Sequence, residues 1–386
     1  MTKKTQPASL ALSRGKALLL CLPMLLLSGL MLSSGKPMQG AQDLIAVGVT
    51  FLFFNVLFYQ MLASGRTDRW RATAFILYAV LLSFTFIIHM FEARGAMSLS
   101  EAKIIECQVP FCHIVIPMTL IPLALTRSII FPGQVAGGYA SIVTMFVLWI
   151  GAGLVLGRGF CSWVCFFGGW DDGFSRLARK ARIRTIPAFW KWLPFAVLLV
   201  VALSSAALLQ PTYCSWFCPF KAVTEFEAVT SMKVLLQTIM FVTLFLGLVV
   251  ILPILTKRRT QCGLFCPMGA LTSFSNYINA FDVRIDPDRC VQCGQCERVC
   301  PVLAITEQSL AIGRPDMTCV KCGKCIDACP KDAIHYHIKG TPPAWKSVMT
   351  RVLFLYVSVL FLTVFAGGTF MEAIKRLLNL VMTGHF

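Results

Sequence analysis

The chain alternates long apolar runs with short loops rich in lysine and arginine. Seven of the runs approach the ~20 residues that an α-helix needs to cross the hydrocarbon of a bilayer, so each predicts a transmembrane helix. The predicted spans are residues 17–34, 44–63, 72–90, 137–156, 193–209, 234–255 and 352–370. A shorter apolar piece, 114–126, contains Pro117 and Pro122. We interpret it as re-entrant or surface-lying, because proline interrupts a helix.

The basic loops indicate how the spans are oriented. Lysine and arginine cluster in residues 66–71, 158–191 and 257–259, and the positive-inside rule places such loops in the cytoplasm. The N-terminus and the segment before the last span then also lie inside, while 92–106 and 210–233 lie outside. Asp171 and Asp172 fall in the most basic loop. They could carry protons coupled to quinone chemistry, but solvated loop carboxylates are commoner, so we expect them to be solvated.

Composition supports a polytopic membrane protein. Of 386 residues, 57% are hydrophobic and only 14% are charged, which is too apolar for an ordinary soluble domain. The net charge of +17 follows from the loops beside the spans. No basic patch interleaved with aromatic residues occurs, so we expect no nucleic-acid partner.

One stretch carries the strongest chemical signal. It reads Cys290-x2-Cys293-x2-Cys296-x3-Cys300-Pro301 and repeats as Cys319-x2-Cys322-x2-Cys325-x3-Cys329-Pro330. This is the bacterial ferredoxin signature, in which the fourth cysteine of each motif ligates the cluster of the other motif. The first predicted [4Fe-4S] set is Cys290, Cys293, Cys296 and Cys329, and the second is Cys319, Cys322, Cys325 and Cys300. A zinc ribbon or a disulfide framework gives no reason for this repeated spacing.

The predicted fold class is therefore an all-α polytopic membrane protein of about seven transmembrane helices, with a small α+β bacterial 2[4Fe-4S] ferredoxin domain inserted before the last helix. The predicted domains are a membrane domain (1–283), the ferredoxin domain (284–340), and the last helix with its tail (341–386). Cluster assembly needs a reducing compartment, which agrees with a cytoplasmic ferredoxin domain.

Three further cysteine pairs form an internal repeat of span plus Cys-x3-Cys. The segments are Cys161-Ser-Trp-Val-Cys165, Cys214-Ser-Trp-Phe-Cys218 and Cys262-Gly-Leu-Phe-Cys266. Cysteines at i and i+4 project from one face of a helical turn. The predicted topology places Cys161, Cys165, Cys262 and Cys266 at the inner face, and Cys107, Cys112, Cys214 and Cys218 at the outer face.

Each of these two sets of four cysteines could hold one further [4Fe-4S] cluster. Two other interpretations stay open. The cysteines could be small helix-packing residues, or the outer pairs could form disulfides in an oxidising compartment.

The Cys-x3-Cys pairs beside spans, followed by the doubled cubane motif, resemble the membrane-bound polyferredoxins of the NapH/NosR type over residues 157–334. Cys214 with Cys218 and Cys262 with Cys266 match the family's Cys-x3-Cys-Pro pairs, whereas Phe166 replaces the proline after Cys165. Cys107 and Cys112 have a longer spacing. The resemblance implies a quinol-linked electron carrier that delivers electrons to periplasmic reductases or supports their maturation.

The sequence thus predicts a multi-pass inner-membrane protein that passes single electrons between the quinone pool or a cytoplasmic donor and a periplasmic redox partner. No phosphate-binding glycine loop, nucleotide fingerprint or flavin-attachment motif occurs. The second interpretation is a non-catalytic redox sensor or a maturation factor for a periplasmic metalloenzyme. The third is a transmembrane thiol relay through Cys107, Cys112, Cys214 and Cys218.

Overall fold

The computed structural model describes residues 11–33, 40–93, 114, 116–127, 142–183, 186–224, 231–342 and 347–384. These residues form a mostly helical protein with one small sheet. Six helices in the described part are long and apolar enough to cross a membrane. They are Arg14–Ser33, Ala41–Ser64, Phe146–Trp163, Phe189–Leu208, Met232–Thr256 and Val348–Thr383. The third predicted span lies in α3 (Thr67–Ala93), and the expected fold class is confirmed.

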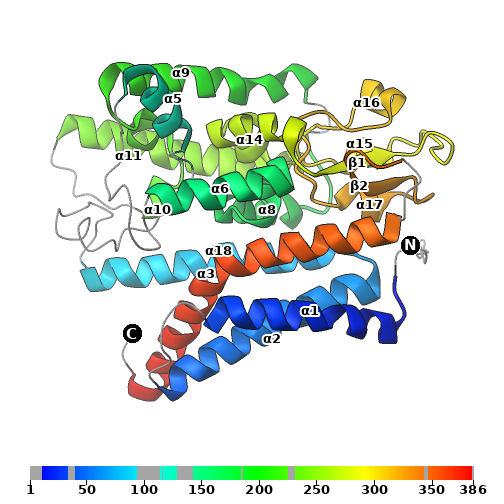
Figure 1. Ribbon diagram of the computed structural model, residues 1–386. Helices are drawn as coiled ribbons and strands as arrows, with labels where there is room; N and C mark the ends of the chain where they lie inside the picture. The colour runs from blue at the N-terminus through cyan, green and yellow to red at the C-terminus, as the bar shows by residue number, and fades with distance from the viewer. Residues whose placement is uncertain are drawn as a thin grey trace.

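The helices form two groups that lie side by side in Figure 1. The lower group in that view contains α1 (Arg14–Ser33), α2 (Ala41–Ser64), α3 and α18 (Ser347–Thr383), which pack on one another. The upper group contains α5 (Ile116–Thr126), α6 (Ile142–Leu156), α8 (Phe166–Leu177), α9 (Leu193–Leu208), α11 (Met232–Leu244), α12 (Leu252–Thr256) and α14 (Pro267–Ile278). Packing of α8 along α3 joins the two groups.

Short helices connect these elements around the cysteine pairs. They are α7 (Phe160–Trp163), α10 (Lys221–Thr224) and α13 (Thr260–Leu264), with 3-10 turns at Gly157–Gly159 and Ala188–Trp192 and π-helical turns at Tyr213–Phe217 and Phe245–Ile251. The apolar helix α5 has 11 residues, which corresponds to about 17 Å at 1.5 Å per residue and is too short to cross a bilayer.

The surface of the long helices suits hydrocarbon. On α1 the side chains of Leu18, Leu19 and Leu22 are more than half exposed, so the apolar face of this helix extends beyond the protein core. Where α1 meets α2, Asn55 donates a hydrogen bond of 2.9 Å to the Ser28 hydroxyl. Such a bond between apolar helices fixes their register in a medium that offers no competing water.

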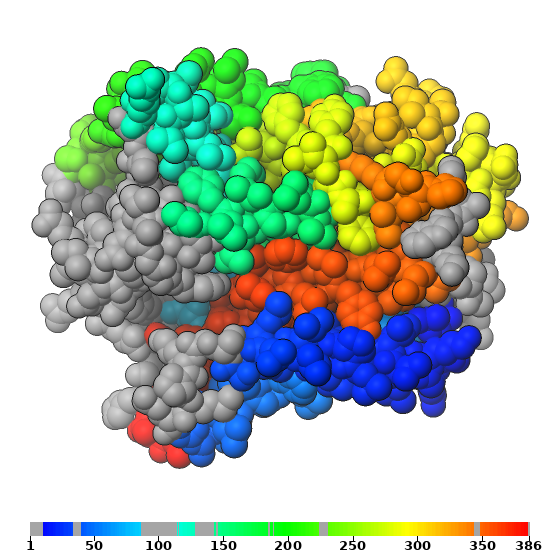
Figure 2. Space-filling model, viewed as in Figure 1, coloured from blue at the N-terminus to red at the C-terminus, as the bar shows by residue number. Residues whose placement is uncertain are grey.

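The ferredoxin region gathers at one end of the helices, on the right in Figure 1. Strands β1 (Phe281–Ile285) and β2 (Ile334–Ile338) pair antiparallel, with Val283 opposite Tyr336. Three short helices follow β1 and precede β2 along the chain: α15 (Gln295–Val299), α16 (Glu307–Ile312) and α17 (Lys324–Ala328). In the space-filling view of Figure 2 this yellow and orange region packs directly against the green upper group and the start of α18.

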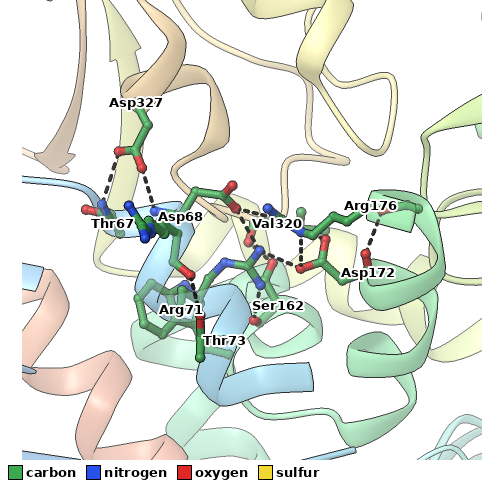
Figure 3. A network of polar contacts seen from close by, with 12 residues as sticks. Thr67, Asp68, Arg71, Thr73, Ser162, Asp172, Arg176, Val320 and Asp327 are labelled. Carbon is green, nitrogen blue, oxygen red and sulfur yellow. Dashed lines mark hydrogen bonds and ion pairs between the residues drawn. The ribbon is translucent and has the colours of Figure 1, made fainter. Parts of the chain in front are cut away.

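A buried network of charges joins the ferredoxin region to the helices (Figure 3). Asp172 on α8 pairs with Arg71 on α3 at 2.8 Å and with Arg259 beside α13 at 3.0 Å. Arg71 also pairs with Asp68 at 2.8 Å. At the other end of the network, the Asp327 carboxylate on α17 accepts the backbone N–H groups of Thr67 and Asp68.

Asp172 is fully buried, so the expectation that it is a solvated carboxylate is wrong. Its position is decided by arginines from α3 and from the chain just before α13, which are far from it in sequence. Buried charges persist only when they are paired, and here the pairing ties three separate segments together.

Replacing Asp172 with asparagine should destabilise the protein strongly. The variant leaves Arg71 and Arg259 buried without this carboxylate, and breaking a buried pair costs about 3–5 kcal/mol. Thermal unfolding of detergent-solubilised protein measures the loss. The matched control is Asp43→Asn, because Asp43 pairs with Lys375 at the surface and such pairs contribute about 0–1 kcal/mol. Equal midpoints for the two variants would contradict a structural role for the network.

Candidate iron–sulfur centres

Two pockets in the ferredoxin region are lined by the cysteines of the doubled motif. The cysteines of the first pocket are Cys290, Cys293, Cys296 and Cys329. Those of the second pocket are Cys300, Cys319, Cys322 and Cys325. Each pocket combines three cysteines of one motif with the fourth cysteine of the other, which is the division that the sequence predicts.

The backbone around the pockets explains how short loops bring the sulfurs together. Gly294 and Gly323 precede α15 and α17 with φ of 66° and 80°, a conformation that glycine adopts without steric cost. At Gly323 a Cβ atom would lie 2.8 Å from the Tyr336 hydroxyl, so no larger residue fits. Cys300 and Cys329 close the motifs, and their Sγ atoms accept backbone N–H groups at 3.2 and 3.3 Å.

The pockets fit a four-iron cluster better than a single ion. No three His, Cys, Asp or Glu side chains among the described residues come close enough to bind one metal ion. In a cubane each thiolate binds a different iron, so its four sulfurs surround a space rather than one point. Burial raises the pKa of Cys319 to about 12, despite the nearby Lys321 ammonium. A metal cluster supplies the positive charge that such a thiol needs to bind as thiolate.

The three Cys-x3-Cys segments share one backbone conformation. The N–H of Cys165 bonds to the carbonyl of Phe160 at 3.1 Å, and the N–H of Cys266 bonds to that of Gln261 at 2.9 Å. Both bonds span five residues, and the middle segment forms a π-helical turn at Tyr213–Phe217. The paired cysteines are therefore separated by a widened turn rather than by the α-helical face expected from their spacing, and such turns often occur at functional sites.

In the first and third segments of the repeat, the second cysteine lies at a helix N-terminus. Cys165 and Cys266 have extended backbones and immediately precede α8 and α14. The positive end of a helix dipole lies at its N-terminus, so α8 and α14 favour a negatively charged sulfur at these positions.

The first and third segments hold each other by reciprocal contacts. Arg158, three residues before Cys161, donates a hydrogen bond of 3.0 Å to the carbonyl of Cys262. Arg259, three residues before Cys262, donates one of 3.5 Å to the carbonyl of Cys161. Each segment thus donates an arginine hydrogen bond to a cysteine carbonyl of the other segment. These contacts bring together Cys161, Cys165, Cys262 and Cys266, which we call the membrane quartet.

The helices that follow the cysteines continue this exchange. Six residues after Cys165, the carboxylate of Asp171 accepts the N–H of Cys262 at 2.8 Å. Six residues after Cys266, the hydroxyl of Thr272 lies 3.4 Å from the Cys161 sulfur. Asp171 is fully buried, so the expectation that it is a solvated loop carboxylate is also wrong.

The third segment folds back along the helix that precedes it. Thr260, the first residue of α13, donates its hydroxyl to the carbonyl of Leu248. Leu248 precedes the end of α12 at Thr256 by eight residues, or about 12 Å of helix. The chain therefore turns back along its own helix before it reaches Cys262.

Cys214 and Cys218 belong to the middle segment and lie beside the membrane quartet. The Tyr213 hydroxyl accepts a hydrogen bond of 2.9 Å from Gln261, and the rings of Phe220 and Phe167 are 3.9 Å apart. The other two members of the predicted outer set, Cys107 and Cys112, lie outside the described residues. Whether these four cysteines form one set stays a prediction.

The second ferredoxin pocket rests directly on the membrane quartet. Ser162 donates a hydrogen bond of 2.6 Å to the carbonyl of Val320, and Trp163 donates one of 3.2 Å to that of Lys321. Arg258 donates one of 2.7 Å to the carbonyl of Cys300. The loop that carries Cys319 and Cys322 is therefore bonded to the segment between Cys161 and Cys165.

The sequence reasoning missed the buried arginines, although a signal for them exists. Arg158 and Arg259 are each 1% exposed. Both stand in the pattern Arg-x2-Cys-x3-Cys-x2-Gly, which the first and third segments share. The middle segment has Pro211 in place of the arginine and Lys221 in place of the glycine. This difference separates the two segments that face each other from the one that does not.

Comparisons with known proteins agree with these centres. A family model described as a 4Fe-4S binding domain matches residues 283–306 and 316–335. A second model with the same description matches 139–184, 191–234 and 238–284. Each of these last three matches contains one Cys-x3-Cys segment, so the repeat and the doubled motif both fall in regions similar to iron–sulfur domains.

Three curated relatives are similar over less than half of this chain. YccM of Escherichia coli K12, provisionally assigned to electron transport, is 27% identical over 44% of this chain. The ferredoxin-type protein MauN of Methylobacillus flagellatus, named for methylamine utilization, is 28% identical over 38%. The regulatory protein NosR of Pseudomonas aeruginosa is 30% identical over 42%.

The matched region spans 48% of YccM, 48% of MauN and 23% of NosR. No solved structure matches the chain. The resemblance to membrane-bound 4Fe-4S ferredoxin-type proteins is confirmed, and so are the membrane and iron–sulfur character that it implies.

Replacing Gly168 with alanine should destabilise the membrane quartet. A Cβ atom at this position would lie 2.4 Å from the carbonyl oxygen of Cys161, so the turn that carries the cysteine must move. Overpacking of this kind costs about 1–3 kcal/mol, which thermal unfolding in detergent measures.

Gly173→Ala in the same helix is the control. Its Cβ would meet Ile76 at 3.6 Å, an ordinary contact, and alanine favours a helix over glycine by about 0.5–1 kcal/mol. The close packing at Gly168 would be contradicted if both variants unfolded at the wild-type temperature.

Proposed function

We propose that this membrane-bound ferredoxin-type protein passes single electrons across the membrane, between the quinone pool or a cytoplasmic donor and a periplasmic redox partner. It would hold at least three [4Fe-4S] clusters: one in each ferredoxin pocket and one on the membrane quartet. When bound, each cluster supplies a site that accepts and releases one electron. The fold supplies the distances, the burial and the hydrogen bonds.

The observation that carries the proposal is the contact between the second pocket and the membrane quartet. The loop from Thr318 to Lys321 is hydrogen-bonded to Arg158, Ser162 and Trp163. The loop of the second pocket and the first cysteine segment of the quartet are therefore in direct contact. Because hydrocarbon about 30 Å thick divides the two sides of a membrane, a cofactor site below the ferredoxin region shortens the path that an electron must cover.

The chain's residues favour an anionic cofactor at the membrane quartet. Helices α8 and α14 begin directly after Cys165 and Cys266, so the positive ends of their dipoles lie near these residues. The Nε atom of buried Arg158 has no acceptor among the described residues. Thiolates that bind iron are soft ligands suited to this metal.

Cys214 and Cys218 would extend the path beyond the quartet. Tyr213 and Gln261, which precede Cys214 and Cys262, are hydrogen-bonded to each other, so the middle segment is next in line after the third. Together with Cys107 and Cys112, this pair would complete a fourth set of four cysteines. An accessory role in maturation of a periplasmic metalloenzyme is the second candidate function, and it would use the same clusters without a continuous path.

Iron content distinguishes these cluster assignments. Anaerobically purified wild-type protein should contain about twelve iron atoms per chain, at four per cluster, and about sixteen if the fourth set is also occupied. Cys262→Ser should remove about four, because one ligand of the quartet is lost. Cys21→Ser is the control, since Cys21 is buried in α1 away from every predicted set. A wild-type content of about eight would refute the third cluster.

The proposed direction across the membrane predicts the side on which each loop lies. A reporter enzyme that is active only outside the cytoplasm should be active when fused after Phe220 and inactive when fused after Lys257. The basic residues at 257–259 favour the cytoplasmic side. An inactive reporter after Phe220 would show that the middle segment is not on the outer side. It would contradict a path that ends at the periplasm.

A further inference from the structure

Arg158 has an unusual environment for a charged residue. It lies on the 3-10 turn Gly157–Gly159 and is 1% exposed. One guanidinium nitrogen donates 3.0 Å to the carbonyl of Thr318 in the ferredoxin region, and another donates 3.0 Å to the carbonyl of Cys262. The remaining nitrogen, Nε, has no acceptor among the described residues. One side chain therefore bridges the second pocket and the membrane quartet.

Arg158 also lacks the counter-charge that its equivalent has. Arg259 occupies the same position in the third segment and pairs with Asp172 at 3.0 Å. In the part of the chain that the structure describes, Arg158 forms no ion pair with a carboxylate. A buried guanidinium without a counter-charge is destabilising, and arginine keeps its charge because it does not lose its proton in proteins.

Cysteines of two sets lie close to Arg158 along the chain segments that it binds. Its guanidinium donates to the carbonyl of Cys262 in the quartet and to that of Thr318, the residue before Cys319 of the second pocket. Four thiolates around a cubane leave the site with net negative charge, which would provide the counter-charge missing from the protein. The same guanidinium is placed to serve both sites, because it is bonded to a backbone carbonyl of each.

We propose that Arg158 is a positioning residue whose buried charge raises the reduction potentials of two clusters at once, the one on the membrane quartet and the one in the second pocket. This inference rests on the proposed function, since it requires a cluster on the quartet. A reduced cluster carries one more negative charge than an oxidised one, so a nearby cation favours the reduced form. Burial keeps salt from screening the effect.

Potentiometric EPR titration of the full-length protein tests the inference. Arg158→Gln removes the charge and should lower the potentials of both clusters by at least a tenfold change in the reduction equilibrium, which is 59 mV for one electron. The cluster in the first pocket should not shift. Arg158→Lys keeps the charge and should keep all potentials near those of the wild type. The shift in Arg158→Gln should persist at high ionic strength.

The control is Arg289→Gln. Arg289 lines the first pocket, but its side chain is 67% exposed, so solvent screens its charge and its loss should leave the potentials of the quartet and second-pocket clusters unchanged. The signal of the quartet is identified as the one that disappears in Cys262→Ser.

Three outcomes would overturn the inference: no shift in Arg158→Gln, an equal shift of all three clusters, or the same shift in Arg158→Lys as in Arg158→Gln. If Arg158→Gln does not fold, Arg158→Lys carries the test, and a tenfold or larger change there contradicts a role for charge. Failure of the proposed function is seen separately, as a wild-type iron content of about eight, before any variant is measured.

Discussion

The exchange of arginine contacts between the first and third cysteine segments is the interaction on which the membrane quartet depends. Helices α7 and α13 end after a few residues, and their carbonyl groups then lack partners within the helix. In a medium without water such groups must be satisfied by the protein. Arg158 and Arg259 do this for each other's segment. Neither segment is satisfied alone, so the four cysteines of the membrane quartet come together only when both segments fold against each other.

The two arginines are equivalent in position but not in charge balance. Arg259 belongs to a network with Asp172, Arg71 and Asp68 that ties α3, α8 and the chain before α13 together. Arg158 lies between the quartet and the second pocket without a carboxylate. Arg259 thus stabilises the fold through an ion pair with Asp172. Arg158 places a positive charge that is unpaired among the described residues next to the cysteines of the quartet. An anionic cofactor on the quartet would supply the negative charge that Arg158 lacks, which accounts for this asymmetry.

Docking of the ferredoxin region joins the two kinds of cysteine site. Contacts from Ser162, Trp163 and Arg258 attach the second pocket to the membrane quartet. Cys293 of the first pocket is exposed, whereas all four cysteines of the quartet are buried. The described sites therefore include one that is open to water and one that is enclosed by helices.

The sequence by itself determined the apolar spans, the resemblance to membrane-bound 4Fe-4S ferredoxin-type proteins and the doubled cysteine motif. Hydropathy and the x2, x2, x3 spacing are local patterns that directly reflect the bilayer thickness and the shape of a cubane. It did not determine that Asp171 and Asp172 are buried, or that Arg158 contacts two cysteine sets. These features depend on partners that lie about 90 to 160 residues apart along the chain. Only tertiary packing decides them, because the energy of a buried charge is set by whatever surrounds it in space.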